Sequence, residues 1–248
     1  MHPVIHIVLP SYGVFAAVGA IIAILFLFFR TDKYGVLFTD FLKMVVLCLI
    51  FGAIGSRLVF IASRIPWLIL NFSVKNVIAT VIGGGFVFYG GLFGVLLGVY
   101  CYSKKHNYDL GKMYNMMAPT IPLFHSIGRI GCLMAGCCYG FEFSERITVF
   151  NLFYMDRFPT QIIEAVFEII LFVVILVYQK KKENPNALRL YLVSYAVFRF
   201  LLEFARGDSV RGVFLILSTS QIISLGILLY FCVKKITCKR QKNVQTST

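Results

Sequence analysis

The sequence has few charged residues, and acidic residues are scarcer still. Of its 248 residues, 14% are charged and 59% are hydrophobic, with 24 lysines and arginines against 11 aspartates and glutamates. An average soluble domain carries about 25% charged residues. The mean hydropathy of +0.83 points the same way. The composition therefore excludes an ordinary soluble protein and predicts an integral membrane protein.

The sequence also lacks a recognisable signal peptide, low-complexity segments and clear internal repeats. No basic n-region opens the chain, and no small-residue cleavage site follows an isolated apolar run. A cleaved signal peptide is therefore not expected. Because no polar stretch is long enough for a soluble domain, we expect residues 1–248 to form a single polytopic membrane domain.

Long apolar runs, in contrast, recur along the whole chain. Spanning a bilayer takes about 20 mostly apolar residues. We expect an all-α integral membrane protein with seven transmembrane helices, at residues 10–29, 44–63, 79–102, 116–135, 161–178, 188–205 and 214–233. The longest outer connection, about 136–160, is aromatic and mixed in charge, so it is a candidate cap over a site.

The connections between these runs differ in positive charge. Six basic residues lie on one side: Arg64, Lys75, Arg146, Arg157, Arg206 and Arg211. Fifteen lie on the other: Arg30, Lys33, Lys43, Lys104, Lys105, Lys112, Lys180, Lys181, Lys182, Arg189, Lys234, Lys235, Lys239, Arg240 and Lys242. The positive-inside rule puts the fifteen in the cytoplasm. The N-terminus is then outside, residues 234–248 form a basic cytoplasmic tail, and the net charge of +13 needs no nucleic-acid partner.

Besides Arg189 at the inner edge of the sixth span, six charged residues fall inside the predicted spans. Each costs about 2.5–3.5 kcal/mol on insertion scales. They are Arg57, Arg129, Glu164, Glu168, Arg199 and Glu203. The predicted orientation places all six in the outer half of the membrane, together with Tyr12 and Gln221. Structural ion pairs are one interpretation, as for Arg199 and Glu203, four residues apart on one helix. Three arginines exceed what one pair needs, and they suit the phosphate of a phospholipid head group.

Glycine and proline are concentrated in two of the predicted spans. Residues 83–94 read GGGFVFYGGLFG. Such glycines allow close helix packing, but their density, at 83–85 and again at Gly90 and Gly91, favours irregular backbone lining a cavity. Pro119 and Pro122 predict a kink in the fourth span.

The seven cysteines are an odd number, and several lie singly inside apolar runs, so a disulfide scaffold is not expected. Cys132, Cys137 and Cys138 form a C-x4-C-C cluster. Zinc sites have C-x2–4-C with a second pair elsewhere, and the only nearby histidine, His125, is seven residues before Cys132. A metal site, a vicinal disulfide and a reactive thiol all remain open, and a small apolar lining is the favoured interpretation.

The stretch GRIGCLMAGCCYG at 128–140 resembles the signature of the prolipoprotein diacylglyceryl transferase family, G-R-x-G-N-F-x-N-x-E with a closing glycine. Further resemblances follow the family's order over nearly the whole chain. They are YGVFAAVG at 12–19, GSRLVF at 55–60, FYGGLFG at 88–94, NMMAPTIP at 115–122, FPTQIIEA at 158–165, FRFLLEFARGD at 198–208 and the following STSQIISL.

The resemblance implies a bacterial multi-pass plasma-membrane enzyme with its active site toward the outer leaflet. Such an enzyme moves a diacylglyceryl group from phosphatidylglycerol to the lipobox cysteine thiol of a prolipoprotein signal peptide, and it releases glycerol phosphate. Its partners are then these substrates and membrane lipid, and no metal or other cofactor is expected. A lipid-group transferase with a different acceptor, or a non-catalytic phospholipid-binding protein, remain the alternatives.

The implied site has a catalytic set and a substrate-binding set. The catalytic set is Arg129, Arg199, Glu203 and Tyr89. The substrate-binding set is Tyr12, Arg57, Gly90, Gly91, Gly128, Gly131, Cys132, Cys137, Gly140, Glu164 and Gln221. In this interpretation Arg129 and Arg199 bind the phosphate, and Glu164 and Glu203 orient them or accept the thiol proton.

Several positions depart from the family's pattern. The histidine before G-G is Tyr89, and the acidic residue before A-P is Asn115. In the signature, the two asparagines and the acidic residue are replaced by Cys132, Ala135 and Cys137. The arginines and the later glutamates of the family's pattern are present in this sequence. The phosphate-binding half of the site is therefore expected to be intact, while the base that activates the acceptor thiol is left unassigned.

Overall fold

The computed structural model describes residues 11–83, 85–149, 153–183, 185–207, 213–214 and 217–245. Parts of several predicted features lie outside the described residues. They are the first residue of the first predicted span, residues 215–216 of the seventh, the last three residues of the predicted tail, Asp208 and Arg211. Two compact units make up the chain. One contains Met1–Cys138 and Gln161–Leu188, and the other contains Tyr139–Thr160 and Arg189–Thr248.

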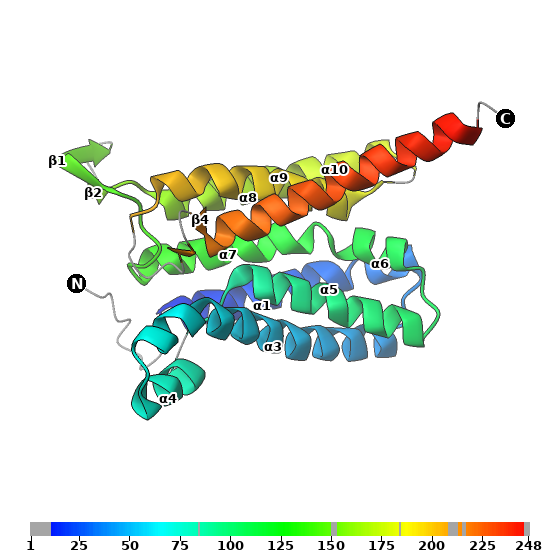
Figure 1. Cartoon of the computed structure of the whole chain (residues 1–248). Coiled ribbons are helices and arrows are strands. Elements are labelled where there is room, and N and C mark those ends of the chain that lie inside the picture. Colours follow the sequence, from blue (N-terminus) through cyan, green and yellow to red (C-terminus); the bar gives the residue numbers. More distant parts are fainter. Residues whose placement is uncertain are drawn as a thin grey trace. The chain divides into compact units, whose positions relative to one another are not determined.

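The first unit is built from helices (Figure 1). They are α1 (Ser11–Phe28), α2 (Thr31–Tyr34), α3 (Phe38–Leu70), α4 (Val74–Gly83), α5 (Phe88–Lys105), α6 (Leu110–Met117), α7 (Thr120–Met134) and nearly all of α8 (Thr160–Lys181). With 33 residues, α3 is about 50 Å long, so it exceeds the hydrocarbon thickness of a bilayer.

The second unit combines helices with two short antiparallel strand pairs. Its elements are β1 (Glu142–Val149), β2 (Phe153–Arg157), nearly all of α9 (Ala187–Leu202), the 3-10 helix η1 (Glu203–Ala205), β3 (Val213–Phe214), β4 (Leu217–Ser218) and α10 (Thr219–Gln245). β1 pairs with β2, with a register shift between Glu142 and Ile147, and β3 pairs with β4. The outer connection at 136–160 thus contains a hairpin that a purely helical prediction lacks.

The prediction of a helical membrane protein is confirmed at this coarser level. Three described helices are long and apolar enough to cross a membrane: α3, α8 and α10 as far as Thr237. The bent pair α4 and α5 makes a fourth if it is counted as one span, and α1 is apolar but shorter. Seven spans, an outer N-terminus and a cytoplasmic C-terminus stay predictions.

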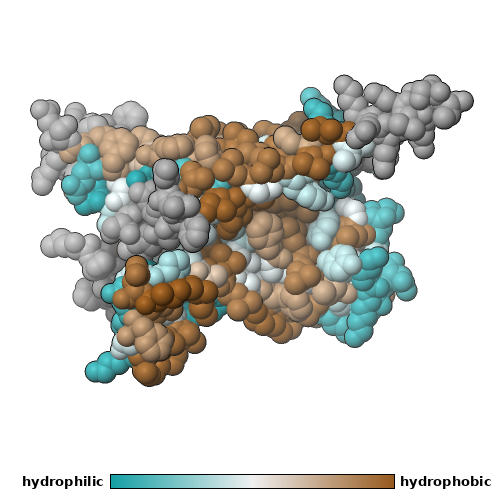
Figure 2. Space-filling view, in the orientation of Figure 1, coloured by the Kyte–Doolittle hydropathy of each residue, from teal (hydrophilic) through white to brown (hydrophobic). Residues whose placement is uncertain are grey.

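The exposed surface of the first unit is suited to lipid. Leu70, Phe72 and Ile82 are 84%, 78% and 77% exposed. In Figure 2 hydrophobic colouring covers α3 and α4, and hydrophilic residues gather near the end of α5. Soluble monomers rarely expose apolar patches of this extent. This surface therefore faces the membrane.

Backbone breaks correct the predicted boundaries. The third span is two helices, α4 and α5, bent by 58°. Gly85 lies between them, as expected for irregular backbone, and Gly84 lies outside the described residues. The same expectation for Gly90 and Gly91 is wrong, because both lie inside α5. The fourth span is broken at Ala118 and Pro119, between α6 and α7.

The ends of the last two spans also differ from the prediction. The α-helical part of the sixth span ends at Leu202 and continues as η1. The seventh span was expected to start at residue 214, but α10 begins at Thr219, because the residues before it form β3 and β4. At its other end α10 extends to Gln245, so this helix includes most of the predicted cytoplasmic tail.

Glycines let α3 and α5 pack closely. Gly90, Gly94 and Gly98 recur every four residues on α5, the small-residue spacing typical of membrane helix pairs. A Cβ on Gly94 would overlap the carbonyl oxygen of Phe51, and one on Gly98 would lie 3.3 Å from Cys48 Cα. Close packing therefore explains these glycines, and the substrate-binding role of Gly90 and Gly91 stays a prediction.

Polar contacts tie the start of α3 to the end of α5 and the segment that follows it. The hydroxyls of Tyr102 and Tyr108 donate to the two carboxylate oxygens of Asp40, at 2.8 and 2.5 Å. The hydrogen bond to Asp40 raises the pKa of Tyr108, because it stabilises the neutral phenol. These contacts support the helix pair at the end remote from the α4–α5 break.

Gly94→Ala should destabilise the protein, because the added methyl group would overlap the backbone of α3. We expect the free energy of unfolding to fall by about 1–3 kcal/mol, measured as a lower melting temperature by circular dichroism in detergent. The matched control is Gly226→Ala on α10, where an added Cβ meets no atom within 4 Å. The control should be neutral or stabilising by up to about 1 kcal/mol, and equal effects of both variants would contradict the packing role.

Candidate active site

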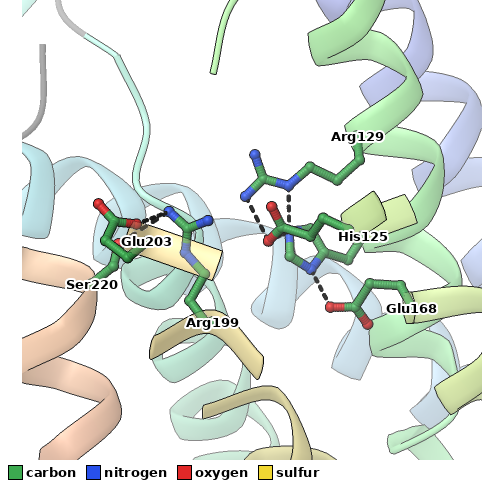
Figure 3. Close-up of polar contacts among 7 residues, drawn as sticks. His125, Arg129, Glu168, Arg199, Glu203 and Ser220 are labelled. Carbon is green, nitrogen blue, oxygen red and sulfur yellow. Dashed lines mark hydrogen bonds and ion pairs between the residues drawn. The ribbon is translucent and has the colours of Figure 1, made fainter. Parts of the chain in front are cut away.

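Arg129 lies on α7 and is held by two neighbours in the first unit. Its Nε donates to Nε2 of His125 at 3.2 Å, and one terminal nitrogen donates to Oε1 of Glu164 at 2.9 Å. Its side chain is buried, as are those of both partners. Figure 3 shows Arg129 and His125 on the same helix, with their side chains turned toward each other. The guanidinium is thus fixed in position.

The geometry also determines the tautomer of His125. Arginine Nε can only donate a hydrogen bond, so His125 Nε2 must accept it. The ring proton is then on Nδ1, which donates to Oε1 of Glu168 at 2.7 Å (Figure 3). The Phe88 ring stacks on the imidazole, with centroids 3.7 Å apart and an interplanar angle of 7°. His125 is therefore a neutral connector between Arg129 and Glu168.

Two carboxylates are buried in this chain of contacts. Glu164 and Glu168 are 1% and 0% exposed and lie one turn apart on α8. The positive charge of Arg129 compensates the negative charge of Glu164. In contrast, Oε2 of Glu168 has no hydrogen-bond partner among the described residues. An unpaired buried polar atom costs free energy. Such burial is unfavourable for stability alone and is typical of functional sites.

An open apolar groove of about 320 Å³ runs along α7 and α8, and Arg129 contributes to its lining. The other lining residues are Ser126, Ile130, Leu133, Gln161, Ile162, Ala165, Val166, Ile169 and Ile170. Several of these apolar side chains are exposed, among them Val166 and Ile170. The groove thus combines an apolar wall with one buried cation, as an amphiphilic ligand requires.

The second unit holds its own buried ion pair. Arg199 donates to Glu203 at 2.8 Å and to the Ser220 hydroxyl at 3.4 Å (Figure 3). Both charged side chains are buried. The pair expected from the i, i+4 spacing is therefore present. Its role in phosphate binding stays a prediction.

Gln221 caps α10. Its Oε1 accepts from the backbone N–H of Ser218 at 3.0 Å, and the Ser218 hydroxyl accepts from the backbone N–H of Gln221 at 3.2 Å. This reciprocal pair is a capping box. The predicted substrate-binding residue thus has a structural task at the start of a helix.

Arg57 supports the break between α4 and α5. Its guanidinium donates to the carbonyl oxygens of Val81 at 2.5 Å and Gly85 at 3.2 Å, and it lies over the rings of Phe60 and Phe86. These donors satisfy carbonyl groups near the end of α4, where helical hydrogen bonding stops. Support is therefore the better interpretation of Arg57.

Tyr89 and Tyr12 lie in different surroundings. Tyr89 is buried on α5, next to the Phe88 that stacks on His125, and it packs against Phe93. Tyr12 is 41% exposed on α1 and interacts electrostatically with Arg129 and Cys132. The structure thus brings Tyr12 to the end of α7 that carries Arg129.

The glycines of the signature have distinct surroundings. A Cβ on Gly128 would meet nothing within 4 Å, which leaves open space beside Arg129. A Cβ on Gly131 would lie 2.7 Å from Phe15, because α1 passes close to α7 there. Gly140, in the second unit, is enclosed by Phe158 and the Ala205 carbonyl. Of Gly128, Gly131 and Gly140, Gly128 has the room expected for a head group.

The cysteines of the signature come together at the end of α7. The sulfur atoms of Cys132, Cys137 and Cys138 all lie within 4.8 Å of one another. Gly136 and Cys138 have φ of 64° and 61°, and a non-glycine residue in this left-handed region costs about 1–3 kcal/mol. This turn brings Cys137 and Cys138 back toward Cys132, which the C-x4-C-C spacing alone does not reveal.

Two residues of the site are not singled out by the sequence alone. His125 is noticeable there only as a possible metal ligand, and Glu168 only as a charge within a span. The signal for both is spacing, because His125 and Arg129 are four residues apart on α7 and Glu164 and Glu168 are four apart on α8. Two such pairs on neighbouring helices can form one hydrogen-bonded chain.

Comparison with known proteins places these features in one family. The profile of the family described as prolipoprotein diacylglyceryl transferase matches residues 3–236. A phosphatidylglycerol–prolipoprotein diacylglyceryl transferase of Clostridium tetani is 37% identical over 224 residues, 87% of each chain. One from Clostridium perfringens is 33% identical and covers 89% of each chain. One from Clostridioides difficile is 28% identical over 94% of this chain and 92% of its own.

The matches span nearly the whole chain and include both units. The family resemblance expected from the sequence is thereby confirmed. The chain belongs to the prolipoprotein diacylglyceryl transferase family.

Proposed function

We propose that the protein transfers a diacylglyceryl group from phosphatidylglycerol to the lipobox cysteine thiol of a prolipoprotein and releases glycerol phosphate. Family membership and the names of its relatives support this activity. The observation that carries it is the buried Arg129 in the lining of the apolar groove. A phospholipid combines the two groups that such a site accommodates, an anionic phosphate and an apolar chain.

Arg129 is the proposed phosphate ligand. Its planar guanidinium carries five N–H donors and matches the geometry of phosphate oxygens. His125 and Glu164 hold the side chain, so little conformational entropy is lost when a lipid binds. The groove along α7 and α8 would take part of an acyl chain, with its exposed side open to the bilayer.

The reaction is a displacement at a glyceryl carbon. The acceptor thiolate forms the S–C bond, the C–O bond to phosphate breaks, and its electron pair leaves with glycerol phosphate. Negative charge develops on the departing phosphate, and Arg129 would stabilise it electrostatically. Arg199, oriented by Glu203, is the second candidate for this task.

The remaining predicted residues receive narrower roles. Tyr12 and Tyr89 are candidate hydrogen-bond donors to the head group, and Gly128 leaves room for it. Arg57 and Gln221 would act through the backbone they support. Residues Gly90, Gly91, Gly131 and Gly140 would act by permitting close backbone approach.

We assign the site to the outer leaflet of a bacterial plasma membrane. The fifteen basic residues on one side against six on the other support an outer N-terminus for the seven predicted spans. In that topology the intramembrane arginines lie at the depth of the outer head groups. Phosphatidylglycerol and a translocated signal peptide are both accessible there.

His125 is unsuited to be the base for the acceptor thiol. Its Nε2 lone pair accepts the Arg129 Nε–H, and its Nδ1 proton is donated to Glu168. It acts instead as a positioning residue for Arg129. Thiol activation must therefore come from another group.

The activity is tested with purified protein, phosphatidylglycerol labelled in the head group, and a lipobox peptide. Release of glycerol phosphate that depends on the peptide supports the proposal. Release without the peptide, or only with another acceptor, would favour a different transferase. Lipid binding without any release would contradict catalysis.

Arg129→Ala should reduce peptide-dependent release by at least about 100-fold, because the developing phosphate charge loses its main donor. Initial rates at saturating lipid measure this loss. Arg64→Ala is the matched control, since Arg64 lies on α3 over the Phe60 ring and outside the site. A folded Arg129→Ala protein with normal turnover would rule out the phosphate assignment.

His125→Phe should lower kcat by at least about tenfold with a smaller effect on KM, because Arg129 loses the acceptor that orients its Nε–H. His125→Gln should restore much of kcat, since an amide oxygen can accept from Arg129 while the amide nitrogen donates to Glu168. The pair is compared by steady-state kinetics and by thermal unfolding. If both variants lose only stability and keep kcat, the positioning role is wrong.

A further inference from the structure

Three thiols lie together beside Arg129, and the mechanism above uses none of them. Cys132 lies in the last turn of α7, and Cys137 and Cys138 follow in the turn after the helix. Their sulfur atoms all lie within 4.8 Å of one another, and no disulfide joins them. Cys132 is buried, whereas the other two are partly exposed.

We propose that Cys132, Cys137 and Cys138 bind one zinc ion as a three-thiolate site with an open fourth position. Zinc–sulfur bonds of about 2.3 Å in a tetrahedron place sulfur atoms about 3.8 Å apart. The sulfur atoms therefore need to approach by at most about 1 Å, which side-chain rotation supplies. Three protein ligands with one open position are typical of catalytic zinc sites rather than structural ones.

The backbone around the cysteines is arranged to hold this geometry. The N–H of Cys137 donates to the carbonyl oxygen of Cys132 at 3.1 Å, and Gln161 Nε2 donates to the carbonyl oxygen of Cys137 at 2.7 Å. Cys138 adopts the left-handed conformation that glycine favours, at φ 61°. An apolar lining does not require such a strained residue, whereas strained residues cluster at ligand-binding sites.

The charges nearby suit a bound metal. Three thiolates and one Zn²⁺ carry a net charge of −1. The Arg129 guanidinium, which is also paired with Glu164, interacts electrostatically with Cys132 and Cys137, and this interaction favours negative charge on their sulfur atoms. The Tyr12 hydroxyl lies in the field of the same three cysteines. The metal would thus be part of the Arg129 site and not a separate structural centre.

The open position gives the zinc a role, which rests on the proposed function. An acceptor thiol that binds there loses its proton to water and stays bound as thiolate. Its sulfur then attacks the glyceryl carbon, the C–O bond breaks, the electron pair leaves with phosphate, and the thioether product dissociates from the metal. Cys132 and Cys137 replace polar residues of the family signature. In this proposal the zinc ion that they help to bind activates the acceptor thiol, for which the altered signature leaves no assigned base.

Metal binding is tested directly on the full-length protein in detergent, reduced and stripped of metal by a chelator. Titration with Co²⁺ should give thiolate-to-cobalt charge-transfer bands at one ion per chain, and Zn²⁺ should displace them. Cys132→Ala, Cys137→Ala and Cys138→Ala should each weaken binding by at least tenfold. Cys101→Ala, on α5, is the control and should bind as the unmodified chain does.

Absence of charge-transfer bands in the unmodified chain would overturn the proposal. Bands that persist when all three cysteines are replaced by alanine would also overturn it. So would a disulfide among the three cysteines, detected as two thiols that react in denaturant only after reduction. None of these readouts requires activity.

The catalytic role is tested by comparing zinc-loaded and metal-free protein in the glycerol phosphate assay. At least tenfold faster release from the zinc-loaded protein supports thiol activation. Equal release overturns that role and leaves the transferase function intact. No release from protein that shows normal cobalt bands contradicts the proposed function and leaves the metal site standing, so the two failures are distinguishable.

Discussion

A cation buried in an apolar environment needs an anionic partner, and Arg129 has one in Glu164 at 2.9 Å. Removing one member of such a buried pair costs about 3–5 kcal/mol, because the other charge is left uncompensated. The pair therefore fixes α7 relative to α8 and, with them, the groove that both helices line. His125 and Glu168 extend the same network by two hydrogen bonds and restrict the guanidinium further.

Three other polar side chains within the apolar helices satisfy backbone groups where helices stop or start. Arg57 binds carbonyl oxygens near the α4–α5 break, Gln161 binds a carbonyl in the turn after α7, and Gln221 caps α10. Irregular backbone at membrane depth needs such partners, because lipid offers none. The polar residues thus divide between those that shape the scaffold and those, such as Arg129, that are available for chemistry.

The sequence predicts the helical membrane architecture and the buried Arg199–Glu203 pair, because hydropathy and i, i+4 spacing are local signals. It misplaces what depends on contacts between distant residues. Gly90 and Gly91 suggested irregular backbone, yet they pack inside α5 against α3, and glycine density alone cannot separate these cases. The seventh span is predicted to start at residue 214, but α10 begins at Thr219, because residues before it pair as β3 and β4. The tautomer of His125 follows only from the position of Arg129 Nε.

The cysteine cluster is the clearest case in which sequence spacing and structure diverge. C-x4-C-C lacks the second pair of ligands that zinc sites of known spacing contain, so a lining role was the simpler interpretation. The left-handed turn at Gly136 and Cys138 brings three sulfur atoms within 4.8 Å of one another. On the outer face of a membrane, free neighbouring thiols are exposed to an oxidising environment and tend to form disulfides. A coordinated metal keeps thiolates reduced and in place, which reconciles three clustered cysteines with the outward site that the charge distribution predicts.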